Sequence, residues 1–103
     1  MEITEITGDN FQTEVTGAGV PVLLEFYADG CESCKAQFSV LKKAASDACD
    51  VKFCRIHVER EPGLTAGYGV GSVPAMVVLN GEQIFRTITG FHSLEEILEY
   101  LEM

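Results

Sequence analysis

Four apolar runs along the chain have the composition of β-strands. Val20–Ala28 is almost entirely apolar and rich in β-branched and aromatic residues, which is typical of a strand buried on both faces. Val51–Val58 and Ala75–Leu79 have the same pattern. Gln83–Thr89 alternates between apolar and polar residues, as an edge or half-covered strand does, and Asn80-Gly81 predicts a hairpin turn before it.

Helical patterns separate these strands. Between Cys34 and Asp47, three apolar residues recur at three- and four-residue spacing, so this window predicts an amphipathic helix (Phe38, Leu41 and Ala45). Residues typical of helix ends predict three shorter helices. The first is capped by Asp9 or Asn10 and runs through Val15, and the second is opened by Pro62 and closed by Gly67 and Gly69. The third runs from a Ser93–Glu96 capping box to about Glu102. The predicted order is strand, helix, strand, helix, strand, helix, strand, strand, helix. This order indicates an α/β fold, in which helices cover both faces of a central mixed sheet.

Length and charge narrow the class of protein. With 103 residues, 47% of them hydrophobic, the chain is expected to form one domain over residues 1–103. The net charge of −9 argues against nucleic acid or an anionic membrane as a partner, because both bind clustered cations. No stretch has the length and apolarity of a membrane span. The acidic start differs from the basic beginning of a secretory signal, so we expect a cytoplasmic protein.

The strongest chemical signal is the Cys31-Glu32-Ser33-Cys34 segment, which follows a buried strand and opens a helix. A helix N-terminus presents free N–H groups and a partial positive charge, which stabilise a thiolate at the first cysteine. The second cysteine, one turn further, is placed to resolve a mixed disulfide with another molecule. The same spacing allows the two cysteines to form a disulfide without backbone movement.

The other cysteines, Cys49 and Cys54, leave several interpretations open. A four-cysteine zinc site is disfavoured because this pair lacks the two-residue spacing of a common zinc knuckle, and no metal is expected. We expect both to be buried, inert thiols, and a regulatory second disulfide is the lesser alternative.

Glu25 is the one charged residue inside the first apolar run, and burial raises the pKa of a carboxyl group. Glu25 is expected to pair with Arg55 on the neighbouring strand, to exchange protons with Cys34, or to do both. His57 and His92 are expected to be structural or solvated.

Taken together, these segments resemble the thioredoxin family through nearly the whole chain, in order and at the family's spacing. The resemblance rests on Pro21–Lys35, on Glu61-Pro62-Gly63 through Gly67-Tyr68-Gly69-Val70, on Ser72-Val73-Pro74, on Asn80-Gly81-Glu82 and on Gly90. It implies the thioredoxin fold, with a mixed sheet of four or five strands flanked by four helices. The sequence departs from the family in having Glu32-Ser33 where Gly-Pro is usual, Gly30 where an aromatic residue is usual, and no tryptophan.

The resemblance also implies roles for individual residues. Cys31 would be the attacking thiol and Cys34 the buried resolving thiol. Pro74 would be cis and would face this pair, and Val73 and Gly30 would help to bind an extended peptide substrate. Glu25 stands where the family has a buried aspartate, and Arg55 stands where it commonly has a lysine.

The activity implied is that of a thiol–disulfide oxidoreductase that needs no bound cofactor. We expect a monomeric, cytoplasmic reductant of protein disulfides that is itself reduced by a thioredoxin-reductase-like electron donor. Two alternatives remain open: a specialised isomerase or donor to one enzyme, and a peptide-binding module without turnover.

Overall fold

The four apolar runs form four of the five strands of a mixed sheet in the computed structural model, which describes residues 3–102. The sheet has the order β1-β3-β2-β4-β5. Strands β1, β3 and β2 are parallel, and β4 and β5 are antiparallel to their neighbours. The strands are β1 (Thr4–Glu5), β2 (Val22–Tyr27), β3 (Lys52–His57), β4 (Ala75–Asn80) and β5 (Gln83–Thr89).

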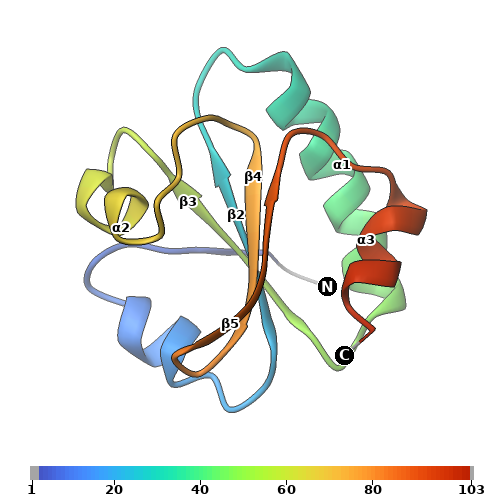
Figure 1. Cartoon of the computed structure of the whole chain (residues 1–103), viewed down its shortest axis with the longest axis horizontal. Helices are drawn as coiled ribbons and strands as arrows, with labels where there is room; N and C mark the ends of the chain where they lie inside the picture. Colours follow the sequence, from blue (N-terminus) through green and yellow to red (C-terminus); the bar gives the residue numbers. More distant parts are fainter. Residues whose placement is uncertain (1–2, 103) are drawn as a thin grey trace.

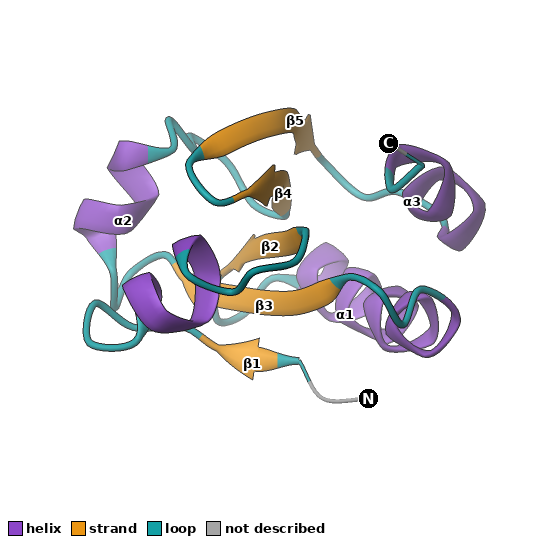
Figure 2. Ribbon diagram, turned by 90° about the horizontal axis from the view of Figure 1, so that it is seen from below, coloured by secondary structure: helices purple, strands orange, loops and turns teal. Residues whose placement is uncertain are grey.

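Helices cover both faces of this sheet, so the predicted α/β fold is confirmed (Figures 1 and 2). Helices α1 and α3 lie on one side, and α2 and the π-helical turn η1 lie on the other. The helical elements are η1 (Gln12–Thr16), α1 (Glu32–Asp47), α2 (Pro62–Gly67) and α3 (Leu94–Tyr100). Among these described helices, none has the length and apolar character needed to cross a bilayer.

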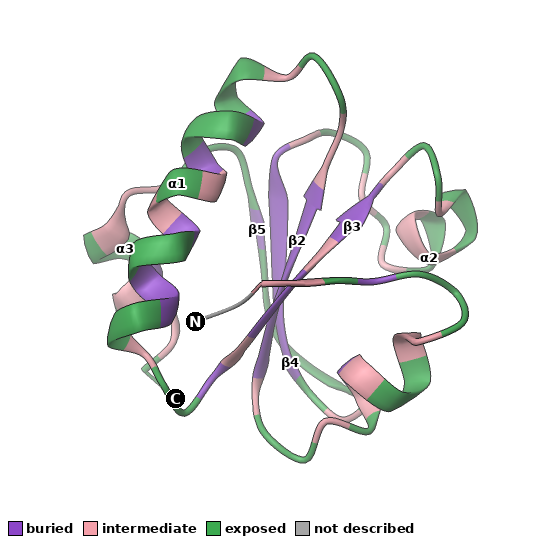
Figure 3. Ribbon diagram, turned by 180° about the vertical axis from the view of Figure 1, so that it is seen from behind, coloured by how far each residue is buried: buried purple, intermediate pink, exposed green. Residues whose placement is uncertain are grey.

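The two faces of β2 belong to two separate hydrophobic clusters. Val22, Leu24 and Phe26 pack toward η1 and α2, whereas Leu23 packs with Leu41 on the side of α1 and α3. The buried central strands are visible in Figure 3. Because side chains alternate along a strand, Glu25 lies on the same face as Leu23, beneath α1.

The ends of several elements differ from the sequence prediction. The prediction that Asp9 or Asn10 caps the first helix is wrong. The Asn10 side chain instead accepts from the backbone N–H of Thr7 at 2.8 Å and donates to the carbonyl of Glu5 at 3.0 Å. These two hydrogen bonds stabilise the turn that follows β1, and η1 begins without a side-chain cap.

The β4–β5 turn is displaced by one residue from its predicted position. Asn80 pairs with Gln83, so the two turn residues are Gly81 and Glu82. Gly81 has a φ of 63°. A positive φ at only the first turn position is the type II′ pattern, which glycine adopts without the steric cost of a Cβ atom.

The Ser93–Glu96 capping box is confirmed. The backbone N–H of Glu96 donates to Ser93 Oγ at 3.2 Å, and the Ser93 N–H donates to Glu96 Oε1 at 3.0 Å. The hydrogen bond from the Ser93 backbone N–H is the main cause that lowers the pKa of the Glu96 carboxyl group. Helix α3 therefore starts where predicted, although it ends at Tyr100 rather than near Glu102.

Candidate active site

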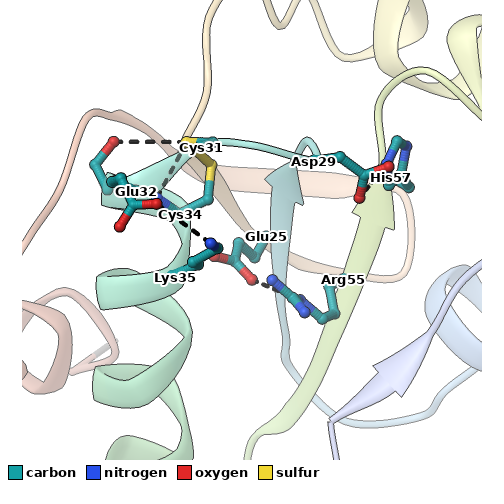
Figure 4. The surroundings of a disulfide bond; sticks show 9 residues. Glu25, Asp29, Cys31, Glu32, Cys34, Lys35, Arg55 and His57 are labelled. Carbon is teal, nitrogen blue, oxygen red and sulfur yellow. Dashed lines mark hydrogen bonds and ion pairs between the residues drawn. A yellow bond between two sulfur atoms is a disulfide. The ribbon is translucent and has the colours of Figure 1, made fainter.

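Cys31 and Cys34 meet where β2 leads into α1, and a disulfide bond joins them with their Cα atoms 5.2 Å apart (Figure 4). Cys31 is the N-cap residue of α1, in an extended backbone conformation. It is partly exposed, whereas Cys34 is only 2% exposed. Another molecule can therefore reach the first sulfur more easily than the second.

Two donors are directed at the Cys31 sulfur. The backbone N–H of Cys34 donates to it at 3.1 Å, and the Ser33 hydroxyl lies 3.6 Å away. In the reduced protein, these groups and the positive end of the α1 dipole would favour the Cys31 thiolate. The exposed Glu32 carboxylate opposes this effect, and Lys35 pairs with it at 3.2 Å. Both of those side chains are well exposed, so the ion pair is weak.

Gly30 allows the turn before Cys31. Its φ is 71°, in the left-handed region that side chains with a Cβ atom rarely adopt. Gly30 stands where the family usually has an aromatic residue, and it allows a backbone conformation that an aromatic residue rarely adopts.

The Val73–Pro74 loop lies at the same edge of the sheet as Cys31. Phe26 pairs with Ala75 in the antiparallel β2–β4 ladder, so the residues just before β4 lie beside those just after β2. The Val73–Pro74 peptide bond is cis, as the resemblance implied. The Pro74 carbonyl accepts from the N–H of Gly90 at 2.8 Å, which ties the loop to the end of β5.

Glu25 is completely buried and pairs with Arg55, as the sequence predicted. The two residues are register partners on β2 and β3, and Arg55 Nε donates to Glu25 Oε1 at 2.9 Å. Glu25 Oε2 has no hydrogen-bond partner among the described residues. Loss of hydration outweighs the attraction of Arg55 and raises the pKa of Glu25 from 4.5 to about 7.

Two aromatic rings hold the Arg55 guanidinium. It lies 3.7 Å from the centre of the Tyr27 ring and 4.0 Å from that of Phe38. Cation–π attraction to both rings restrains the guanidinium beside Glu25. This arrangement was not predicted from the sequence, although the alternate positions of Glu25 and Tyr27 on β2 indicate one shared face.

A hollow of about 220 Å³ lies beside this ion pair, and Cys34, Arg55 and Phe38 are among the residues that line it. It is large enough for several water molecules. In Figure 4, Glu25 lies between the disulfide and Arg55. The site thus contains a buried sulfur, a carboxyl group that titrates near neutral pH, and room for water.

The histidines have different surroundings. The His92 backbone is held by the buried Gln37 of α1, which accepts from its N–H at 2.8 Å and donates to its carbonyl at 3.0 Å. His57 is 3% exposed and lies beside Asp29, with its Nε2 3.2 Å from Asp29 Oδ1. Neither the role of Gln37 nor the Asp29–His57 contact was predicted from the sequence.

The expectation that Cys49 and Cys54 are both buried is half correct. Cys54 is buried in β3, and loss of hydration raises its pKa to about 11. The expected burial of Cys49 is wrong, because α1 ends at Asp47 and Cys49 lies on the exposed turn before β3. Both thiols are free.

Comparisons with known proteins agree with this geometry. The family model described as Thioredoxin matches residues 2–103. A protein named Thioredoxin from Streptomyces clavuligerus is 27% identical, over 85% of this chain and 82% of its own length. Proteins of the same name from Rickettsia bellii and Buchnera aphidicola are 27% and 26% identical, over 95% and 98% of this chain and 94% of each relative.

Proposed function

Because the chain belongs to the thioredoxin family and is a thiol–disulfide oxidoreductase, we propose that it reduces disulfide bonds in other proteins. The observation that carries the proposal is the unequal exposure of the two sulfurs. Cys31 is partly exposed at the start of α1, and Cys34 is buried directly behind it. One sulfur is suited to meet a substrate and the other to complete the exchange within the molecule.

The reaction starts from the reduced protein. The Cys31 thiolate attacks one sulfur of a substrate disulfide, forms a mixed disulfide, and releases the other substrate sulfur as a thiolate that takes a proton. The Cys34 thiolate then attacks Cys31. This step forms the Cys31–Cys34 disulfide and releases the second substrate thiol, so that two electrons pass to the substrate.

Glu25 is proposed to accept the proton that Cys34 must lose before it attacks. A pKa of about 7 suits a group that exchanges protons near neutral pH. Cys34 and Arg55 both line the hollow of about 220 Å³, so water there would connect Cys34 to the ion pair that contains Glu25. In a single-turnover assay, Glu25→Gln should slow release of the reduced substrate at pH 7 while the protein stays folded. An unchanged rate in the folded variant would reject this role.

The substrate is proposed to bind as an extended peptide across Gly30, Val73 and Pro74. These residues lie at the edge of the sheet that carries Cys31. An extended segment offers its backbone for pairing and its disulfide sulfur to Cys31. The net charge of −9 favours substrates with basic surfaces.

A thioredoxin-reductase-like protein is proposed to restore the dithiol. We place this cycle in the cytoplasm, with the chain acting as a monomer, since reducing compartments keep such a pair available as thiols.

The decisive experiment uses the Cys49→Ser variant as background, because Cys49 is the other exposed thiol. Reduction of a disulfide-bonded protein is followed with dithiothreitol as electron donor. The background protein should turn over and Cys31→Ser should be inactive. Cys34→Ser, reduced beforehand and then mixed with the substrate after the dithiothreitol has been removed, should accumulate a mixed disulfide, visible by non-reducing electrophoresis and mass spectrometry.

Two results would change the assignment. Peptide binding without turnover in the background protein would favour the docking module. A glutathione redox titration that places the Cys31–Cys34 pair among oxidants would favour an isomerase or a specialised donor.

A further inference from the structure

Three potential metal ligands, none of them a cysteine, meet at the edge of the sheet where β2 and β3 end. They are Asp29 after β2, His57 at the end of β3 and Glu59 in the turn that follows. One side-chain ligand atom from each residue lies within 4.8 Å of the other two. Asp29 and His57 lie side by side in Figure 4.

The backbone fixes this arrangement. Tyr27 and His57 are register partners in the parallel β2–β3 ladder, so the chain leaves both strands at the same level. The turn after β3 closes when the N–H groups of Arg60 and Glu61 donate to the His57 carbonyl at 3.2 and 3.0 Å. This turn directs Glu59 back toward the imidazole.

His57 is the feature that points to a ligand. Its side chain is 3% exposed, and neither ring nitrogen has a hydrogen-bond partner among the described residues. Its Nε2 lies 3.2 Å from Asp29 Oδ1, but not in the geometry of a hydrogen bond. A buried imidazole without a partner is costly, and a metal ion would satisfy its free nitrogen.

The spacing suits a small transition-metal ion. For bonds of about 2.0–2.1 Å, the ligand atoms of a tetrahedral zinc site are about 3.3 Å apart. The Asp29–His57 separation of 3.2 Å already matches this edge. Glu59 is exposed, and rotation of its side chain can bring its carboxylate closer. Imidazole and carboxylates are ligands that zinc and its first-row neighbours accept.

We propose that Asp29, His57 and Glu59 bind one divalent first-row transition-metal ion, such as zinc, with water in the fourth position. The sequence had given no indication of this site. The ion would join the segment that precedes Cys31 to the end of β3. The site uses none of the cysteines, so it would exist in the oxidised protein.

The test uses the oxidised protein in the Cys49→Ser background, so that no exposed thiol competes for metal. Zinc chloride is titrated into it by calorimetry. We expect one zinc ion per chain and an affinity that falls at least about 10-fold in His57→Asn. Asp29→Asn and Glu59→Gln, which alter exposed side chains, should also weaken binding. His92→Asn is the matched control and should bind zinc as the background protein does.

Absence of zinc binding by the oxidised background protein would overturn the proposal. So would an unchanged affinity in His57→Asn. If His57→Asn does not fold, background-like affinity in both Asp29→Asn and Glu59→Gln would overturn it equally. That outcome would leave Asp29 and His57 as a simple ion pair.

Discussion

Replacing Glu25 by glutamine is expected to remove much of the loss of stability that the folded protein shows as the pH rises from about 5 to 8. The pKa of this buried carboxyl group is raised from 4.5 to about 7, chiefly by loss of hydration. At a pH between these two pKa values, the folded protein keeps the proton on Glu25, whereas the unfolded chain has lost it. The free energy of unfolding therefore falls as the pH rises through this window.

The size of this effect follows from the pKa difference. A difference of about 2.5 in pKa, at about 1.4 kcal/mol for each pKa unit, gives about 3–4 kcal/mol over the whole window. This stability is fully present below pH 4.5 and is lost above about pH 7. Glutamine has nearly the same shape and carries no charge at any of these pH values, so the variant should lack this component.

Urea unfolding of the oxidised protein at pH 5, 6, 7 and 8 measures the effect. The stability of Glu25→Gln relative to the unmodified protein should rise by about 2–3 kcal/mol across this range, because a smaller part of the effect already falls below pH 5. The exposed Glu99, changed to glutamine, is the control and should give a difference that does not vary with pH. A constant difference for Glu25→Gln as well would refute the argument from burial.

Three further substitutions test other parts of the site and its support. Gln37→Ala removes both side-chain hydrogen bonds to the His92 backbone and should cost about 2–3 kcal/mol in urea unfolding at pH 7; a loss below about 1 kcal/mol would contradict this. Arg55→Met removes the charge and the donor that lower the pKa of Glu25, so that pKa should rise further in a carboxyl ¹³C NMR titration. A lower value would show that Arg55 does not stabilise the carboxylate. Ser93→Ala breaks the capping box of α3 and should reduce stability by about 1 kcal/mol, with faster amide exchange in this helix as the accompanying sign.

Local sequence patterns predicted most of the elements. The run that became β2, the C-x-x-C at the start of α1 and the Ser93–Glu96 box each carry their signal within a few residues. Such signals reflect the local preference of the backbone for helix or strand and show which positions face the core. These preferences act within a few residues and depend little on the rest of the fold. The pairing of Glu25 with Arg55 was also predictable, because a buried carboxylate needs a partner and the next strand offered one.

Other features depend on where a helix ends and on contacts between residues far apart in the sequence. No local pattern predicts these. Gln37 is buried because the segment after β5 passes over α1 and offers it two backbone groups. Cys49 is exposed because α1 ends just before it.

By itself, the sequence determined the order of helices and strands and the place of the reactive pair, because periodicity and helix-end chemistry act over a few residues. The tertiary structure decided what faces each buried group. The register of β2 against β3 sets Glu25 beside Arg55 and brings Asp29 to His57. Register is a relation between segments far apart in the chain, and the pKa of Glu25 and the proposed metal site both depend on it.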